Sequence, residues 1–137
     1  MALDPVLIAD TRGWIERAAN DLRGAQIDLA ASPPLVEDAL FHCQQATEKL
    51  LKAFLTFHNQ PFRRTHNLEE LGEACLALDA TLQTIVDEAV PLTEYAWLYR
   101  YPGPAVVPGL TEAEMAYAIA QRVYGAILNR IPNAAHP

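Results

Sequence analysis

Cationic and histidine side chains gather in one stretch of an otherwise acidic sequence. The chain has 137 residues and a formal charge of −7, but residues 41–66 contain one acidic residue against two lysines and two arginines. Three of the four histidines also fall in this stretch. A local group of cations attracts anions, and its small extent favours a compact anion such as a phosphate group. The overall deficit of Lys and Arg argues against duplex DNA as a partner, since DNA binding needs many phosphate contacts.

Four polar residues in this stretch have the spacing of one helical face. His42, Gln45, Lys49 and Lys52 would lie on the same side of an α-helix and offer several hydrogen-bond donors to an anion. Glu48 and Lys52 also have the i,i+4 spacing of an ion pair. The same pattern is typical of a solvated polar face with one weak ion pair, so both interpretations stay open.

A short loop after this segment supplies further donors. Arg63, Arg64 and His66 precede Asn67, which is a good N-cap for a following helix. Backbone N–H groups at a helix start bind anions, and nearby guanidinium groups strengthen such a site. We therefore expect His66 to be an anion contact.

A third candidate group is aromatic. Arg100 lies within a segment that holds Tyr95 and Tyr101, and residues 101–109 form a loop with three prolines and two glycines. Aromatic rings around an arginine can stack a nucleotide base or hold the cation. We expect Arg100 to contact an anion and Tyr95 or Tyr101 to stack, although packing at a helix end with Arg100 exposed explains the composition equally well.

The elements that must position these residues are all predicted to be helices. Strand signals are nearly absent, and apolar residues recur at helical spacing. The sequence predicts an all-α fold, an up-and-down antiparallel bundle of four long helices plus one short helix, in one domain spanning residues 1–137. The predicted helices cover residues 11–31, 34–59, 68–78, 79–99 with a break at Pro91, and 111–130.

Local signals set several of these boundaries. Asp10 or Thr11 is expected to cap the first helix. Thr111 forms a capping box with the glutamate three residues later and should begin the last helix. Pro132 should end that helix, and the tail from about residue 131 is expected to be frayed.

Composition and motif content argue against several classes of protein. No apolar run approaches the roughly 18 residues of a membrane span, and no signal peptide is evident, so a cytoplasmic location is expected. Cys43 and Cys75 lie in apolar helical patterns, which predicts two buried free thiols. The single serine, Ser32, is placed as a helix cap rather than a nucleophile. Standard zinc spacing and glycine-rich phosphate loops are missing from the sequence, so neither a metal nor a cofactor is predicted.

Taken together, three motifs resemble the HEPN domain, the higher eukaryotes and prokaryotes nucleotide-binding family. The motifs are Phe41-His42-x-Gln44-Gln45-Ala46-x-Glu48-Lys49-x-x-Lys52-Ala53, Thr65-His66-Asn67-Leu68-x-x-Leu71 and Tyr99-Arg100-Tyr101-Pro102. The resemblance covers nearly the whole chain. It implies an up-and-down helical bundle, commonly a homodimer. Many members accompany small nucleotidyltransferases, often as toxin–antitoxin pairs, and others are RNases that need no metal.

The RNase branch of that family carries an arginine followed, after four to six residues, by a histidine, and this chain departs from that pattern. Arg100 has no histidine behind it. Arg130 and His136 match the spacing, but Pro132 and the expected fraying deprive them of a rigid frame, so the match is interpreted as accidental.

These observations lead to three hypotheses. The first is a module that binds a nucleotide or another phosphorylated ligand through Lys49, Lys52, His66 and Arg100, and works with a nucleotidyltransferase. The second is a metal-independent endoribonuclease or toxin in which Arg100 stabilises the scissile phosphate and His66 is the acid–base residue. The third is an oligomerising scaffold without a ligand site. The acidic net charge favours the first over the second.

Overall fold

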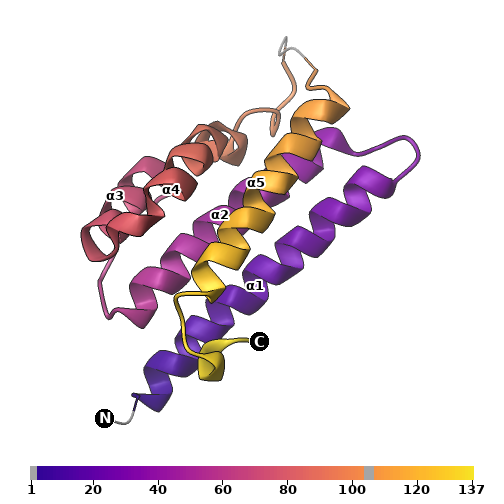
Figure 1. Cartoon of the computed structure of the whole chain (residues 1–137). Coiled ribbons are helices and arrows are strands. Elements are labelled where there is room, and N and C mark those ends of the chain that lie inside the picture. Colours follow the sequence, from indigo (N-terminus) through magenta and orange to yellow (C-terminus); the bar gives the residue numbers. More distant parts are fainter. Residues whose placement is uncertain (1–2, 104–106) are drawn as a thin grey trace.

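The structure, a computed structural model, describes residues 3–103 and 107–137, and every regular element in these ranges is helical (Figure 1). The all-α prediction is therefore confirmed. No helix in the described part of the chain is long and apolar enough to cross a membrane. The α-helices are α1 (Pro5–Ala30), α2 (Val36–Phe57), α3 (Leu68–Leu78), α4 (Gln83–Ala89) and α5 (Leu110–Leu128), and the 3-10 segments are η1 (Ala80–Leu82), η2 (Val90–Ala96) and η3 (Asn133–Ala135).

Helix α2 lies at the centre of an up-and-down bundle. It packs against α1, α5, α3 and η2. Helices α1 and α2 run antiparallel, and α5 runs alongside α2 after the segment from α3 to η2 has carried the chain back (Figure 1). The predicted fourth long helix is divided, because α4 gives way to 3-10 geometry at η2, where Pro91 lacks the N–H that an α-helix requires.

Helix α1 begins earlier than the sequence signals suggested. Asp4 is its N-cap, and the Asp4 carboxylate accepts a hydrogen bond from the Val6 amide at 2.9 Å. Pro5 occupies the first turn, where its missing N–H is not needed. The expectation of a cap at Asp10 or Thr11 is wrong, because the Thr11 hydroxyl donates to the Leu7 carbonyl at 2.8 Å inside the helix.

Helix α5 also starts differently from its prediction. Gly109 is the N-cap and the helix begins at Leu110, so the capping box at Thr111 is not formed. Asn67, in contrast, caps α3 as predicted, and its side chain accepts hydrogen bonds from the Glu69 and Glu70 amides. Residues 104–106 of the predicted 101–109 loop lie outside the described residues.

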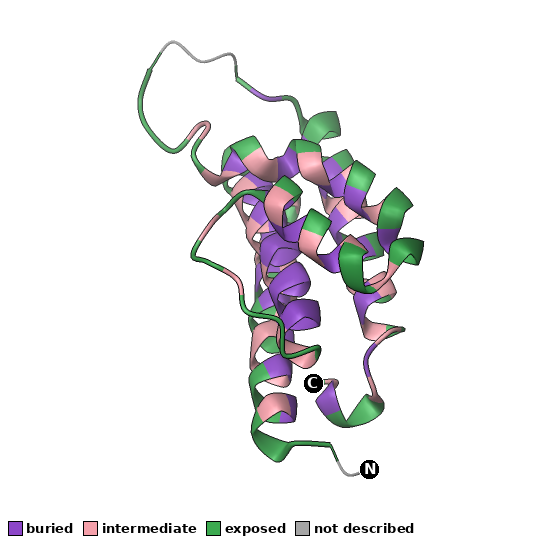
Figure 2. Ribbon diagram, turned by 90° about the vertical axis from the view of Figure 1, so that its left-hand side faces the viewer, coloured by how far each residue is buried: buried purple, intermediate pink, exposed green. Residues whose placement is uncertain are grey.

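The apolar core is formed largely by α2, whose side chains are buried on most of its circumference (Figure 2). Cys43 and Cys75 are both fully buried free thiols, which confirms that prediction. Burial raises the pKa of each thiol to about 12, and the carboxylates of Asp28 and Asp21 add to this effect at Cys43. Both cysteines therefore stay protonated at neutral pH.

The carboxyl-terminal tail is folded rather than frayed. Pro132 follows the end of the last helix as expected, but Ala135 in η3 is fully buried and η3 packs on α1. The Arg12 side chain donates a hydrogen bond to the Ala134 carbonyl. The His136 ring nitrogen Nε2 lies 2.9 Å from the Leu128 carbonyl oxygen. These contacts over a long sequence separation could not be read from local composition.

Candidate functional site

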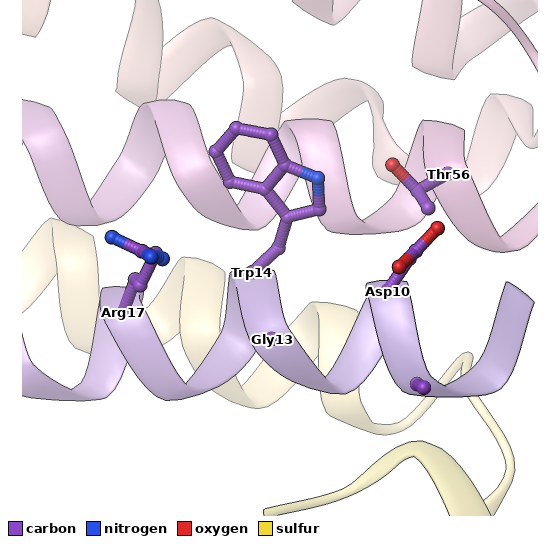
Figure 3. A pocket seen from close by; sticks show the side chains of 6 residues that line it. Asp10, Gly13, Trp14, Arg17 and Thr56 are labelled. Carbon is purple, nitrogen blue, oxygen red and sulfur yellow. The ribbon is translucent and has the colours of Figure 1, made fainter. Parts of the chain in front are cut away.

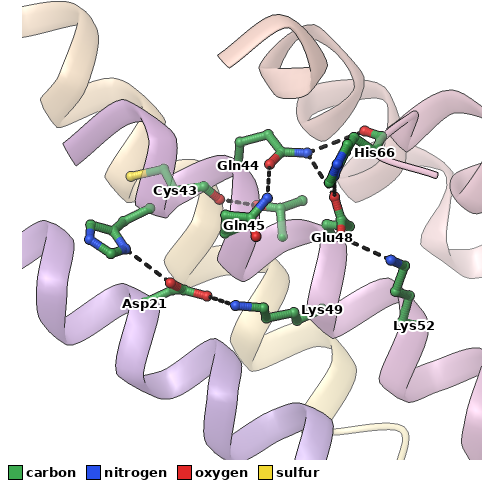
Figure 4. A network of polar contacts seen from close by, with 10 residues as sticks. Asp21, Cys43, Gln44, Gln45, Glu48, Lys49, Lys52 and His66 are labelled. Atoms are coloured by element: carbon green, nitrogen blue, oxygen red, sulfur yellow. Dashed lines mark hydrogen bonds and ion pairs between the residues drawn. The ribbon is translucent and has the colours of Figure 1, made fainter. Parts of the chain in front are cut away.

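Helix α2 carries two clusters of polar side chains at the heart of the bundle (Figure 4). One connects α2 to the loop before α3, and we call it the Glu48 cluster. The other connects α2 to α1, and we call it the Asp21 cluster. The Glu48 cluster consists of Gln44, Gln45, Glu48, Lys52 and His66, and the Asp21 cluster consists of Asp21, Asp28, Asp38, His42 and Lys49.

In the Glu48 cluster, one buried carboxylate receives three donors. Glu48 is 4% exposed. Its Oε2 accepts from the Lys52 ammonium at 2.9 Å, which confirms the predicted i,i+4 pair. Its Oε1 accepts from His66 Nδ1 at 2.7 Å and from Gln44 Nε2 at 3.2 Å. The charge of Glu48 is thus satisfied within the bundle.

Aromatic rings close this cluster on the side of α1. The Lys52 ammonium lies 5.5 Å from the centre of the Trp14 ring and 5.8 Å from that of Phe62, within cation–π range. Lys52 is 8% exposed. The predicted solvated face is therefore a buried ion pair, and the Lys52 ammonium is not available to an external phosphate.

His66 is the exposed member of the Glu48 cluster. Gln44 Nε2 donates to the His66 backbone carbonyl at 3.2 Å, and two residues further on the Leu68 amide donates to the Thr93 hydroxyl at 3.2 Å. The His66 side chain is 63% exposed. Glu48 engages Nδ1, so Nε2 is the ring nitrogen left for a ligand.

In the Asp21 cluster, carboxylates outnumber cations. Asp21 accepts from His42 Nδ1 at 2.9 Å and from the Lys49 ammonium at 2.5 Å. The other ring nitrogen, His42 Nε2, lies 3.5 Å from Asp38 Oδ2 and 4.0 Å from Asp28 Oδ2. Burial, reinforced by the neighbouring Asp38 carboxyl, raises the pKa of Asp28 to about 6. Lys49, like Lys52, is already paired with a carboxylate.

Arg100 lies at a separate place, over the first half of α2. Its guanidinium is 3.9 Å from the centre of the Phe41 ring. Tyr99 has a φ of 65°, which is unfavourable for an aromatic residue and turns the chain just before Arg100. A hollow of about 250 Å³ lies here, lined by Glu37, Asp38, Phe41, Tyr95, Leu98, Tyr99 and Arg100.

The predicted convergence of four cations in one pocket is wrong. Arg100 lies over Phe41 and Lys52 comes eleven residues later on α2, which is about 16 Å along the helix axis. Lys49 points to Asp21 on α1. Lys49 and Lys52 are each paired with a carboxylate inside the bundle. Of the four predicted cations, His66 and Arg100 are left as donors, and they contact neighbouring turns of α2 on the same side.

The three remaining candidates have different fates. Tyr95 is buried, and its ring stacks on Tyr99 with centres 6.3 Å apart and planes at 22°. Tyr101 is exposed and does not line the hollow beside Arg100. Gln45 donates to the Gln44 side-chain oxygen at 2.7 Å. Of the two predicted stacking residues, Tyr95 lines the hollow but is held in the core.

Sequence reasoning missed the acidic residues of the Asp21 cluster. By sequence alone, Leu22 and Leu29 fit an apolar stripe on α1, but the buried positions are one residue earlier, at Asp21 and Asp28. These two carboxylates continue the buried series of Ala18 and Ala25. The sequence did contain a signal for the cluster, since Asp21 and Asp28 are spaced two helical turns apart and fall in line with the small residues of that buried stripe.

Another hollow, of about 340 Å³, lies between α1 and α2 (Figure 3). Asp10, Trp14 and Arg17 of α1 and Thr56 of α2 line it. No residue of either polar cluster lines this hollow, and neither does Arg100. We assign no function to this hollow.

Comparison with known proteins identifies the family to which this helical bundle belongs. The family model of the HEPN domain matches residues 11–131, and the chain therefore belongs to the HEPN family. Among solved structures, the chain is similar to ST0689, an archaeal HEPN homologue, with a TM-score of 0.70 and 23% sequence identity over 89% of this chain and 98% of that one. This likeness shows the shared fold. No curated protein matches the sequence significantly.

Proposed function

We propose that this HEPN protein binds a nucleotide or a similar small phosphorylated ligand where Arg100 and His66 flank α2. The observation that carries the proposal is the placement of Arg100. Its guanidinium lies over the Phe41 ring beside the 250 Å³ hollow, and no carboxylate of the described residues lies within 4.0 Å of it. A guanidinium placed over an aromatic ring in this way keeps its donors for a phosphate.

His66 is the second contact. Phe41, Gln44 and Glu48 follow one another on one side of α2, with Arg100 over the first and His66 bonded to the other two. The two contacts therefore lie about 5–10 Å apart along the helix axis. That separation suits a nucleotide better than a single inorganic phosphate.

The acidic wall of the hollow helps to choose the orientation. Glu37 and Asp38 line it together with Tyr99. Carboxylates repel phosphate but accept hydrogen bonds from ribose hydroxyls and base amino groups. The nucleoside would then enter the hollow, and the phosphate would face the outer side of Arg100 and His66.

The test is calorimetric titration of nucleoside mono-, di- and triphosphates into the wild type and Arg100→Ala. A charge-assisted contact to phosphate is worth about 1.5–3 kcal/mol, so the substitution should weaken binding roughly ten- to a hundredfold. Arg122→Ala is the matched control. Arg122 forms an ion pair with Glu88 at 2.8 Å, and neither residue lines the hollow. Equal affinities of wild type and Arg100→Ala would overturn the proposal.

We also propose that the protein forms a homodimer and works with a nucleotidyltransferase partner, as many members of its family do. Support for an interface comes from large apolar side chains that are exposed near the start of α5. These are Trp97, Tyr101, Val107, Leu110 and Met115. Light scattering at tens of micromolar should give twice the chain mass, and Met115→Glu should lower it. A clean monomer for the wild type would contradict the dimer.

One observation favours metal-independent RNA cleavage as a second candidate. Glu48 holds His66 Nδ1 at 2.7 Å while the ring stays exposed, which is how a carboxylate orients a histidine for acid–base work. RNA incubated with excess chelator should then be cut by the wild type and not by His66→Ala or Arg100→Ala. Intact RNA with all three proteins would leave the binding module as the function.

A further inference from the structure

The Asp21 cluster contains a buried carboxylate oxygen without a partner. Asp28 is 7% exposed, and its Oδ2 has no hydrogen-bond partner among the described residues. This oxygen lies 4.0 Å from His42 Nε2, and the same ring nitrogen lies 3.5 Å from Asp38 Oδ2. One atom each from Asp28, Asp38 and His42 lie within 4.8 Å of one another. A buried acceptor that no protein group satisfies calls for a ligand that does.

The imidazole of His42 is oriented for that ligand. Asp21 can only accept, so His42 donates Nδ1–H to it, and Nε2 is the ring nitrogen that faces Asp28 and Asp38. Lys49 fixes Asp21 in turn, at 2.5 Å. A carboxylate behind a histidine in this way is the usual support of a metal-binding imidazole.

The His42 ring packs closely against α1 at Gly24. Gly24 of α1 faces the ring, and a Cβ at that position would lie 3.1 Å from His42 Nε2. Glycine inside a helix is destabilising relative to alanine. Gly13, on the same helix, has no atom within 4 Å of such a Cβ, so close approach is specific to Gly24.

The backbone holds the three residues together. The Asp28 carbonyl accepts from the Leu35 amide at 2.9 Å, which closes the connection between α1 and α2. Asp38 and His42 follow one turn apart at the start of α2, opposite Asp28. The cluster is thus part of the rigid helical frame rather than of a loop.

Charge points to the nature of the ligand. Histidine binds metal ions as the neutral imidazole, and in that form the carboxylates of Asp21, Asp28 and Asp38 against the one ammonium of Lys49 give the cluster a net charge of −2. A divalent cation cancels this charge. Two ligand atoms about 2.1 Å from a tetrahedral ion lie about 3.4 Å apart, close to the 3.5 Å between His42 Nε2 and Asp38 Oδ2.

We infer that Asp28, Asp38 and His42 bind a divalent transition-metal ion such as Zn²⁺, with water in the remaining coordination position. One nitrogen and two carboxylate oxygens suit Zn²⁺ or Co²⁺ better than Mg²⁺, which prefers oxygen alone and keeps its waters. This inference departs from the sequence-based expectation of no metal. It shares Asp38 with the wall of the proposed nucleotide hollow but uses neither Arg100 nor His66, so the two sites can be tested separately.

The experiment is titration of Zn²⁺, and separately of Co²⁺, into tag-free protein freed of metal with a chelator, at neutral pH. We expect one ion per chain, visible absorption on Co²⁺ binding and a higher melting temperature with Zn²⁺. Mg²⁺ should produce none of these changes at the same concentration. Absence of Zn²⁺ and Co²⁺ binding at 100 µM would overturn the inference and leave a proton shared by Asp28 and Asp38 as the occupant.

Variants test the individual ligands. Asp28→Asn and His42→Gln should weaken Zn²⁺ binding at least tenfold, whereas Asp10→Asn, on the exposed side of α1, should not change it. Each variant is checked by circular dichroism. Unchanged affinity in folded Asp28→Asn and His42→Gln would place any bound ion elsewhere and refute the site.

Gly24→Ala provides a variant that keeps every ligand. Its added methyl group should push the His42 ring and weaken Zn²⁺ binding, whereas Gly13→Ala, which has open space, should bind normally. Arg100→Ala should also bind Zn²⁺ normally even though it loses nucleotide, which separates this inference from the proposed function. Equal zinc affinity in Gly24→Ala and Gly13→Ala would contradict the geometry.

Discussion

The two polar clusters of α2 are built from similar residues and differ in balance. In the Glu48 cluster, a single carboxylate is surrounded by donors from Gln44, Lys52 and His66. In the Asp21 cluster, carboxylates are in excess, and Asp28 Oδ2 has no hydrogen-bond partner in the part of the chain that the structure describes. A satisfied buried network stabilises the fold that contains it, whereas an unsatisfied one costs stability until something binds. The difference separates a structural cluster from a candidate ligand site.

This comparison also explains why the lysines are poor phosphate contacts. The sequence made Lys49 and Lys52 candidates for phosphate contacts, because residues 41–66 contain four Lys or Arg residues and one acidic residue. Both pair with carboxylates that come from α1 or from the preceding turn of α2. A cation that already neutralises a buried acid cannot be withdrawn without leaving that acid alone.

The largest expected effect is on the satisfied cluster. Lys52→Ala leaves Glu48 buried without its ammonium, and removal of one partner from a buried pair costs about 3–5 kcal/mol. Urea unfolding of the metal-free protein should show this loss. Arg63→Ala, which breaks the exposed pair of Arg63 with Glu70, should cost less than about 1 kcal/mol. Equal losses in the two variants would show that the Glu48 cluster is not a structural element.

In the Asp21 cluster, substitution of Asp28 should raise the stability of the metal-free protein rather than lower it. Asp28→Asn removes a buried charge whose Oδ2 has no hydrogen-bond partner among the described residues, and it introduces an amide that can donate to Asp38. We expect the metal-free variant to be about 1–2 kcal/mol more stable than the wild type near neutral pH. Urea unfolding with chelator present measures the difference. Zinc should then stabilise the wild type and not the variant, and a destabilised variant would mean that Asp28 has a partner in the native protein.

The smallest expected effect is on the reactivity of the two thiols, Cys43 beside the Asp21 cluster and Cys75 away from it. Burial raises the pKa of Cys43 and of Cys75, so neither should react with a thiol reagent in the native protein at neutral pH. Both should react fully in urea, and strong reductant should leave the fold unchanged. Cys43 should label no faster in Asp28→Asn, because burial is the larger cause of its raised pKa. Rapid native labelling of Cys43 would show that the Asp21 cluster is open to solvent.

Much of the architecture followed from patterns within a few residues. The cap at Asn67, the break at Pro91, the Glu48–Lys52 pair and the burial of both cysteines are all confirmed. The start of α1 was misplaced, because Asp10 and Thr11 fit a cap but tolerate a helix interior just as well. The acids of α1 were overlooked as well, since a shift of one residue in the assigned stripe moves Asp21 and Asp28 from the surface to the core.

The sequence by itself thus determined the helices, their order and the family, because caps, prolines and i,i+4 contacts act over one or two turns. The tertiary structure alone decided the sites. The packing of α1 on α2 brings Asp28 to His42, and the turn at Tyr99 lays Arg100 on Phe41. These pairs are far apart in the chain, and their contact depends on how whole helices are rotated against one another. No local pattern encodes that rotation, because it is set by the close packing of the entire core.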